Sequence, residues 1–233
     1  MPIAVGGNIQ CPFEVNKWGI HVVWLIIIAA LALAIGPIFY LLPSAQDRFL
    51  SGLRQHARQL GFSMQLHSLA KLDPTADERV TSSGRQLDPV VKCMCYQWLV
   101  REPLNAPPDL ILRRLPDAAT VPVQEVRPGW GVPTSGERQS LDVAALELIG
   151  KSENVQNALF QCVQTLPAAV LALGVDTRSV SLYWREEAAI PRVADEKARL
   201  DDGKSLLEEL RQHLQTVALA LVEAYGLRSN DPY

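Results

Sequence analysis

The chain has 233 residues and a formal net charge of −3, and 48% of its residues are hydrophobic while 20% are charged. This near-neutral balance argues against a nucleic-acid-binding protein, which usually needs a clustered basic surface. The 4 cysteines are too few and too dispersed for a disulfide-stapled scaffold. Beyond an apolar N-terminal segment about 190 residues remain, which is enough to bury a hydrophobic core.

Residues 18–42 read WGIHVVWLIIIAALALAIGPIFYLL and contain no charged side chain. A helix of about 25 residues is roughly 37 Å long and crosses a hydrocarbon core of about 30 Å with some tilt. Trp18 and Trp24 lie toward one end and Tyr40 near the other, where aromatic rings favour the membrane interface. Pro37 is expected to bend the last turns. We therefore predict a transmembrane anchor; a buried core helix or a cleaved signal peptide fits this length and composition less well.

The cations that flank this segment indicate its orientation. Lys17 precedes the segment, whereas Arg48, Arg54 and Arg58 follow within about 16 residues. The positive-inside rule then places the C-terminal part in the cytoplasm and the short tail of residues 1–17 outside.

Residues 43–62 are predicted to form a basic amphipathic helix beside the membrane. Ser44 and Asp47 resemble a capping box, and Gly61 supplies a stop. One face of this helix carries Phe49, Leu53, Ala57 and Leu60. Two roles remain open: the apolar face packs on the domain, or the helix lies on anionic headgroups through Arg48, Arg54 and Arg58.

Residues 63–190 are predicted to form an α+β domain with a mostly antiparallel sheet and packing helices. Strands are expected at 64–69, 90–100, 110–112, 121–126, 169–173 and 179–185, of which the last two form a hairpin. Helices are expected at 141–149 and 153–166. The polar stretch 71–89 is expected to be an exposed loop, and 127–138 a loop that carries Trp130.

Residues 191–233 are predicted to form a C-terminal helix, over 204–225, and a tail. Its apolar residues repeat at alternating steps of three and four, as in a heptad seam: Leu207, Leu210, Leu214, Val217 and Leu221. This seam either covers the domain's own sheet or meets a partner helix.

Cys93 and Cys95 are the first candidates for chemistry. Residues two apart on a strand face the same side, so we expect both thiols to fill one face of the sheet. A metal or redox site would need further ligands at matching spacing. The remaining candidates of suitable type are Cys162 and 4 scattered histidines. The sequence lacks a nucleophile elbow and a glycine-rich phosphate loop. No catalytic, metal or cofactor-binding residue is therefore predicted.

The run DERVTSSGR at residues 77–85 resembles the D-E-V-V-T-S-G-G run of the small YajC-type accessory subunit of the bacterial preprotein translocase, which also places a membrane helix before a small β domain. The segment GPIFYLLPSAQDRFLSGLRQHARQLGF at 36–62 is similar to single-pass inner-membrane proteins of proteobacteria. The first resemblance implies an accessory role beside a membrane complex, the second implies an origin and no activity, and neither supplies a site residue.

These observations lead to one main functional hypothesis, a non-catalytic, membrane-anchored accessory or scaffold subunit of a bacterial inner-membrane complex for respiration or translocation. Its expected partners are the lipid bilayer and larger integral membrane subunits, and neither nucleic acid nor a cofactor. The alternative is a membrane-tethered enzyme or a metal or redox protein that uses Cys93 and Cys95. A third hypothesis is a lipid-surface sensor built on the helix at 45–60.

Overall fold

The computed structural model describes residues 22–33, 44–102, 104–135, 139–190 and 195–226. The chain divides into two compact units, residues 1–44 and residues 45–233. In the first unit, residues 22–33 are helical and their side chains, that of Trp24 included, are exposed. No helix within the described ranges is both long and apolar enough to cross a membrane. Much of the predicted anchor, with Trp18, Pro37 and Tyr40, lies outside those ranges.

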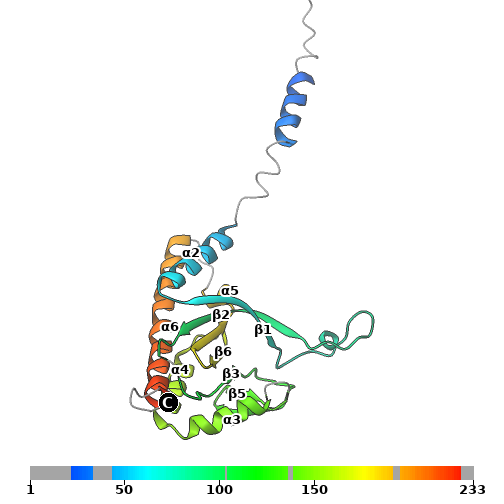
Figure 1. Cartoon of the computed structure of the whole chain (residues 1–233). Helices are drawn as coiled ribbons and strands as arrows, with labels where there is room; N and C mark the ends of the chain where they lie inside the picture. Colours follow the sequence, from blue (N-terminus) through cyan, green and yellow to red (C-terminus); the bar gives the residue numbers. More distant parts are fainter. Residues whose placement is uncertain (1–21, 34–43, 103, 136–138, 191–194, 227–233) are drawn as a thin grey trace, which may run out of the picture. The chain divides into compact units, whose positions relative to one another are not determined.

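The centre of the second unit is a seven-stranded sheet in the order β1-β2-β7-β6-β3-β5-β4 (Figure 1). Every neighbouring pair is antiparallel, which confirms the predicted α+β class and sheet type. The strands are β1 (Ser63–Ala70), β2 (Val90–Leu99), β3 (Leu110–Arg114), β4 (Val123–Arg127), β5 (Trp130–Pro133), β6 (Val170–Val175) and β7 (Ser179–Trp184).

The strand β5 corrects the sequence prediction, which placed Trp130 in a loop. Gly129 adopts a φ of +74°, so it forms the tight turn that joins β4 to β5. Gly131 lies inside β5, and a Cβ atom there would be 2.4 Å from the backbone oxygen of Gln124 on β4. The absence of a side chain at Gly131 therefore permits β4 and β5 to approach closely. From the sequence alone, Gly131 could not be distinguished from a second glycine in the turn.

The polar connection between β1 and β2 is also more structured than a simple exposed loop. It contains a 3₁₀ turn, η1 (Asp77–Arg79), and Val80 forms a bridge with Gln86. Leu72, near its start, is buried, and its carbonyl accepts hydrogen bonds from the backbone N–H groups of Thr120 and Val121. The expectation of an exposed loop thus fails at Leu72, because backbone contacts with the segment before β4 enclose it.

The helices of the second unit are α2 (Ala45–Gln59), α3 (Gln139–Gly150), α4 (Glu153–Thr165), α5 (Glu186–Ala189) and α6 (Glu196–Tyr225). One core joins α2, α4 and α6 to one face of the sheet, as Leu53, Leu159 and Leu210 pack there with sheet residues such as Leu182. Strand alternation sends Cys93, Cys95 and Tyr183 to the opposite face, where they form a smaller cluster with Leu69 and Ala172. The main core therefore lies between the sheet and the helices.

The helix α6 begins eight residues before its predicted start because Asp195 caps it. The Asp195 side chain accepts hydrogen bonds from the backbone N–H groups of Lys197 and Ala198. All five residues of the predicted seam, from Leu207 to Leu221, are buried in the core of this same chain. This face of α6 is therefore filled by the domain itself and is not free for a partner helix.

The helix α2 packs on α6 through its apolar face, on which Phe49, Leu50, Leu53 and Ala57 are buried. Gly203 of α6 makes the close approach possible, since a Cβ atom there would lie 2.8 Å from Ile190 and 2.9 Å from Leu53. The apolar face of this helix therefore packs on the domain, the first of the two roles considered for it.

Candidate functional site

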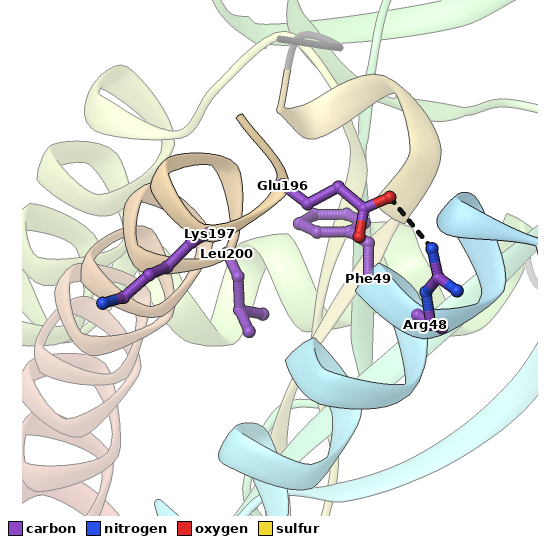
Figure 2. Close-up of a pocket in the computed structure, with 5 residues that line it drawn as sticks. All are labelled: Arg48, Phe49, Glu196, Lys197 and Leu200. Carbon is purple, nitrogen blue, oxygen red and sulfur yellow. Dashed lines mark hydrogen bonds and ion pairs between the residues drawn. The ribbon is translucent and has the colours of Figure 1, made fainter. Parts of the chain in front are cut away.

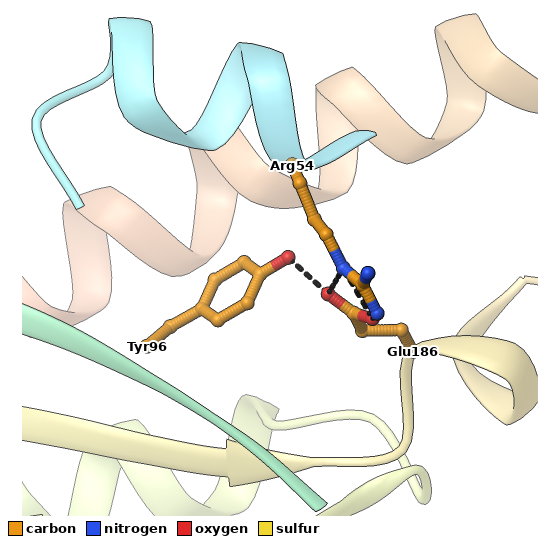
Figure 3. Close-up of polar contacts among 3 residues, drawn as sticks. All are labelled: Arg54, Tyr96 and Glu186. Atoms are coloured by element: carbon orange, nitrogen blue, oxygen red, sulfur yellow. Dashed lines mark hydrogen bonds and ion pairs between the residues drawn. The ribbon is translucent and has the colours of Figure 1, made fainter. Parts of the chain in front are cut away.

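A buried carboxylate joins α2, β2 and α5 (Figure 3). Glu186, the first residue of α5, is 4% exposed and accepts hydrogen bonds from Arg54 and Tyr96. The Arg54 Nε lies 3.1 Å and 3.0 Å from the two carboxylate oxygens, and its Nη2 lies 2.5 Å from Oε2. The Tyr96 hydroxyl donates to Oε1 over 2.5 Å. Three elements that are distant in the sequence thereby meet at one ion pair.

The electrostatics of this cluster keep both donors protonated. Burial, together with the carboxylate of Glu186, raises the pKa of Tyr96. The hydrogen bond to Glu186 raises the pKa of Arg54. The Trp184 ring packs edge-on against Tyr96, with 5.2 Å between the ring centroids. A carboxylate held by a cation and a hydroxyl in this way acts as a clamp on α2.

A shallow pocket of about 290 Å³ lies between the start of α2 and the start of α6 (Figure 2). Its lining combines three charged side chains with two apolar ones: Arg48, Glu196, Lys197, Phe49 and Leu200. The Arg48 Nη2 lies 3.2 Å from Glu196 Oε1, and the two side chains are 60% and 52% exposed. An ion pair this exposed contributes little to stability, on the order of 0–1 kcal/mol. Arg48 is therefore able to exchange Glu196 for another anionic partner.

Below this pocket, the buried Arg199 of α6 fixes the position of Phe49. Its guanidinium carbon lies 3.9 Å from the centroid of the Phe49 ring, a cation–π contact. The same group donates to the side-chain oxygen of Gln46 over 2.9 Å and to the carbonyl of Ile190 over 3.3 Å. Phe49, in the apolar floor of the pocket, thus lies against a buried guanidinium that two hydrogen bonds hold in place.

The cysteines lie where strand alternation predicts, on one face of the sheet and buried. The Cys93 thiol donates to the carbonyl of His67 over 3.6 Å, and burial raises the pKa of Cys93 to about 11. Burial also raises the pKa of Cys95, and that of Cys162 to about 12 in the main core. Within the described ranges, no three side chains of the metal-ligating kinds are grouped to hold an ion. The burial of this pair and the raised pKa values of its thiols favour packing over nucleophilic chemistry.

Polar groups beside the cysteines brace the sheet. Arg113 of β3 is buried and donates from Nη2 to the carbonyl of Ala70 over 2.9 Å, which joins β3 to the end of β1. The Asp142 carboxylate accepts a hydrogen bond from the backbone N–H of Ile111 in β3 over 3.0 Å, which joins α3 to this strand. Burial lowers the pKa of His67, and the charge of Arg113 adds to this effect. His67 is accordingly neutral near pH 7.

The three predicted headgroup-binding cations are placed differently. Arg48 lines the pocket, Arg54 is held by the buried Glu186, and Arg58 is exposed. The sequence prediction that these arginines contact lipid stays a prediction. Sequence reasoning selected neither Tyr96 nor Glu186 as a site residue. The available signal was an acidic residue two positions after the end of a buried strand, but its partners are 90 and 132 positions away.

Comparison of the chain with protein-family models, with curated proteins and with solved structures finds no match. Two features of the chain bear on its function: the apolar helix of the first unit, and the pocket at the start of α2. The pocket's remaining members, Lys197, Glu196, Phe49 and Leu200, come from two helices that the sequence pattern did not bring together.

Proposed function

We propose that this protein is a non-catalytic, membrane-anchored accessory or scaffold subunit of a bacterial inner-membrane complex, of the respiratory or the translocation kind. Residues 18–42 form the single-pass anchor, and the domain of residues 45–233 lies on the cytoplasmic side. Its partners are the bilayer and larger integral membrane subunits. The single observation that carries this proposal is the exposure of the apolar helix at residues 22–33.

The exposure of this helix is costly in water. Nine of its large apolar side chains are exposed, from 42% at Ile27 to 79% at Leu33. At about 25 cal/mol per Å² of apolar surface, leaving them in water costs on the order of 10 kcal/mol. Apolar surfaces of this extent mark contact with a membrane or with another protein. The charge-free residues on either side, 18–21 and 34–42, extend the apolar stretch to the length of a span.

The flanking cations support a cytoplasmic domain. Lys17 stands on one side, against Arg48, Arg54 and Arg58 on the other. Although Arg54 is paired with Glu186 in the folded domain, the positive-inside rule counts cations by their position in the sequence beside the span. All three arginines therefore count toward the bias.

The domain's polar side chains support a scaffold role over catalysis. Arg54, Glu186 and Tyr96 clamp α2 to the sheet, and Arg113 ties β3 to β1. The raised pKa values of the buried thiols argue against the alternative of an enzyme or redox protein built on Cys93 and Cys95. A tethered domain raises the effective concentration of its surface near membrane partners, so that weak contacts suffice.

The test is crosslinking in native membranes followed by purification of the full chain in mild detergent. The proposal expects larger integral membrane proteins to be crosslinked and to copurify. In the matched variant Ile27→Arg/Leu31→Arg, which places charges in the exposed helix, both signals should be lost, while Ile27→Leu/Leu31→Ile retains them. A chain that purifies alone, with no crosslinked membrane protein, would contradict the scaffold role.

A further inference from the structure

The pocket between α2 and α6 has a lining that suits one class of ligand. Resting on the anchor in the proposed function, we propose that this pocket binds the phosphodiester of an anionic glycerophospholipid. Arg48 and Lys197 hold the phosphate, and Phe49 and Leu200 contact the glycerol and the first methylenes. The domain would then read the lipid composition of the leaflet to which it is tethered.

Given the proposed anchor, the length of the chain limits how far this pocket can lie from the membrane. Arg48 lies six positions after Leu42, the last residue of the apolar segment. Even fully extended, six residues span at most about 21 Å. Glu196 is hydrogen-bonded to Arg48, so the α6 side of the pocket lies within a similar distance. The polar layer on each side of a bilayer is about 5–8 Å thick, which is less than this limit, so the connection is compatible with contact between the pocket and the headgroups.

The charges of the lining fit a single negative charge. Lys197 forms no ion pair within the described part of the chain, and Arg48 is held only by the exposed Glu196. Two cations and one carboxylate leave an excess of one positive charge, which matches a phosphodiester. The guanidinium suits a phosphate because its planar donors bind two oxygens at once. The first N–H groups of α6 are already satisfied by Asp195, so the side chains, and not the helix terminus, make this site.

The floor and the size of the pocket distinguish a lipid from free phosphate. Phe49 is buried and held by Arg199, while Leu200 is partly buried, so a solvated inorganic ion would leave this apolar surface unused. The volume of about 290 Å³ is at the lower limit of small-molecule sites, near 300 Å³. It accommodates a headgroup and the beginning of the chains, and the remaining lipid stays in the bilayer.

The test is native mass spectrometry of the full chain, purified in detergent and titrated with phosphatidylglycerol or phosphatidylcholine. We expect preferential retention of phosphatidylglycerol. Since one cation near a charged lipid surface contributes about a factor of five, Arg48→Gln and Lys197→Gln should each weaken retention about fivefold. Arg58→Gln on the same helix and Lys151→Gln, both at exposed positions, are the matched controls and should change it less than twofold.

Three outcomes would overturn the inference. One is equal retention of the two lipids, and another is an equal loss with Arg58→Gln, which would indicate a diffuse basic surface. The third is competition by soluble glycerol phosphate at the lipid's own concentration, which would indicate a site for free phosphate esters. A failed anchor is recognised separately, because the chain would then be extracted from membranes without detergent.

Discussion

Tyr96 and Glu186, 90 positions apart in the chain, share a hydrogen bond of 2.5 Å in the interior of the domain. On its other side the same carboxylate binds Arg54 of α2, the helix that follows the apolar segment. This buried carboxylate therefore links α2 to β2 and α5.

Removal of either charge from this clamp should destabilise the domain unequally. Arg54→Gln leaves Glu186, which is 4% exposed, as an uncompensated buried charge, and we expect a loss of about 3–5 kcal/mol. Glu186→Gln leaves Arg54, whose side chain is 38% exposed and remains hydrated, so a loss of about 1.5–3 kcal/mol is expected. Urea unfolding of the detergent-solubilised chain measures both values.

The neighbouring residue provides the control for this pair. Glu187 is exposed, and Glu187→Gln should change the free energy of unfolding by less than about 0.5 kcal/mol. A larger loss from Glu186→Gln than from Arg54→Gln would show that the carboxylate is not the buried partner.

The seam of α6 gives a second prediction, because one helix offers a buried and an exposed leucine. Leu214 is 0% exposed and Leu219 is 70% exposed. Leu214→Ala should cost about 2–5 kcal/mol through lost burial and a cavity, while Leu219→Ala should be nearly neutral. Thermal unfolding by circular dichroism compares the two. Similar effects of both substitutions would mean that α6 packs on another face.

His67 predicts how stability depends on pH. Burial and Arg113 lower its pKa in the folded domain, so the unfolded chain binds a proton more readily. Stability is therefore highest above the unfolded pKa of about 6.5 and falls as the pH drops through that value. In His67→Gln this contribution is absent, and the urea midpoint should decline less between pH 8 and pH 5.5. Equal declines in both proteins would rule out His67 as the source.

The buried thiols predict slow modification of the native domain. In a Cys11→Ser background, Cys93, Cys95 and Cys162 should react with a maleimide at pH 8 only after urea is added, because burial raises the pKa of all three. Rapid native labelling of Cys93, or metal bound in the intact chain and lost in Cys93→Ser, would restore the redox or metal alternative.

The sequence predicted the parts of this fold whose burial follows a regular period. Alternation in β2 placed Cys93 and Cys95 on one face, and the three-four spacing from Leu207 to Leu221 located the buried face of α6. Trp130 was wrongly predicted to lie in a loop because glycines flank it. A glycine in a turn cannot be distinguished by sequence from one in a strand where two backbones approach closely. The earlier start of α6 had a local signal, the capping aspartate Asp195, that was not used.

Neither polar cluster could be found from local patterns. Arg54 and Glu186 are 132 positions apart, and Arg48 and Glu196 are 148 apart. A charged residue is usually exposed, so its burial is evident only once a partner from a distant element is in place. The periodicity of α2 predicted which face of the helix is buried. It did not distinguish Arg54, which is bound to Glu186, from Arg58, which is exposed.

The most direct test of the membrane anchor is flotation of the intact chain from bacterial membranes that have been washed in alkaline carbonate. We predict that it stays with the lipid and rises with it through a density gradient, and that the Ile27→Arg/Leu31→Arg variant remains at the bottom. Recovery of the unaltered chain in the carbonate supernatant, without detergent, would contradict the account.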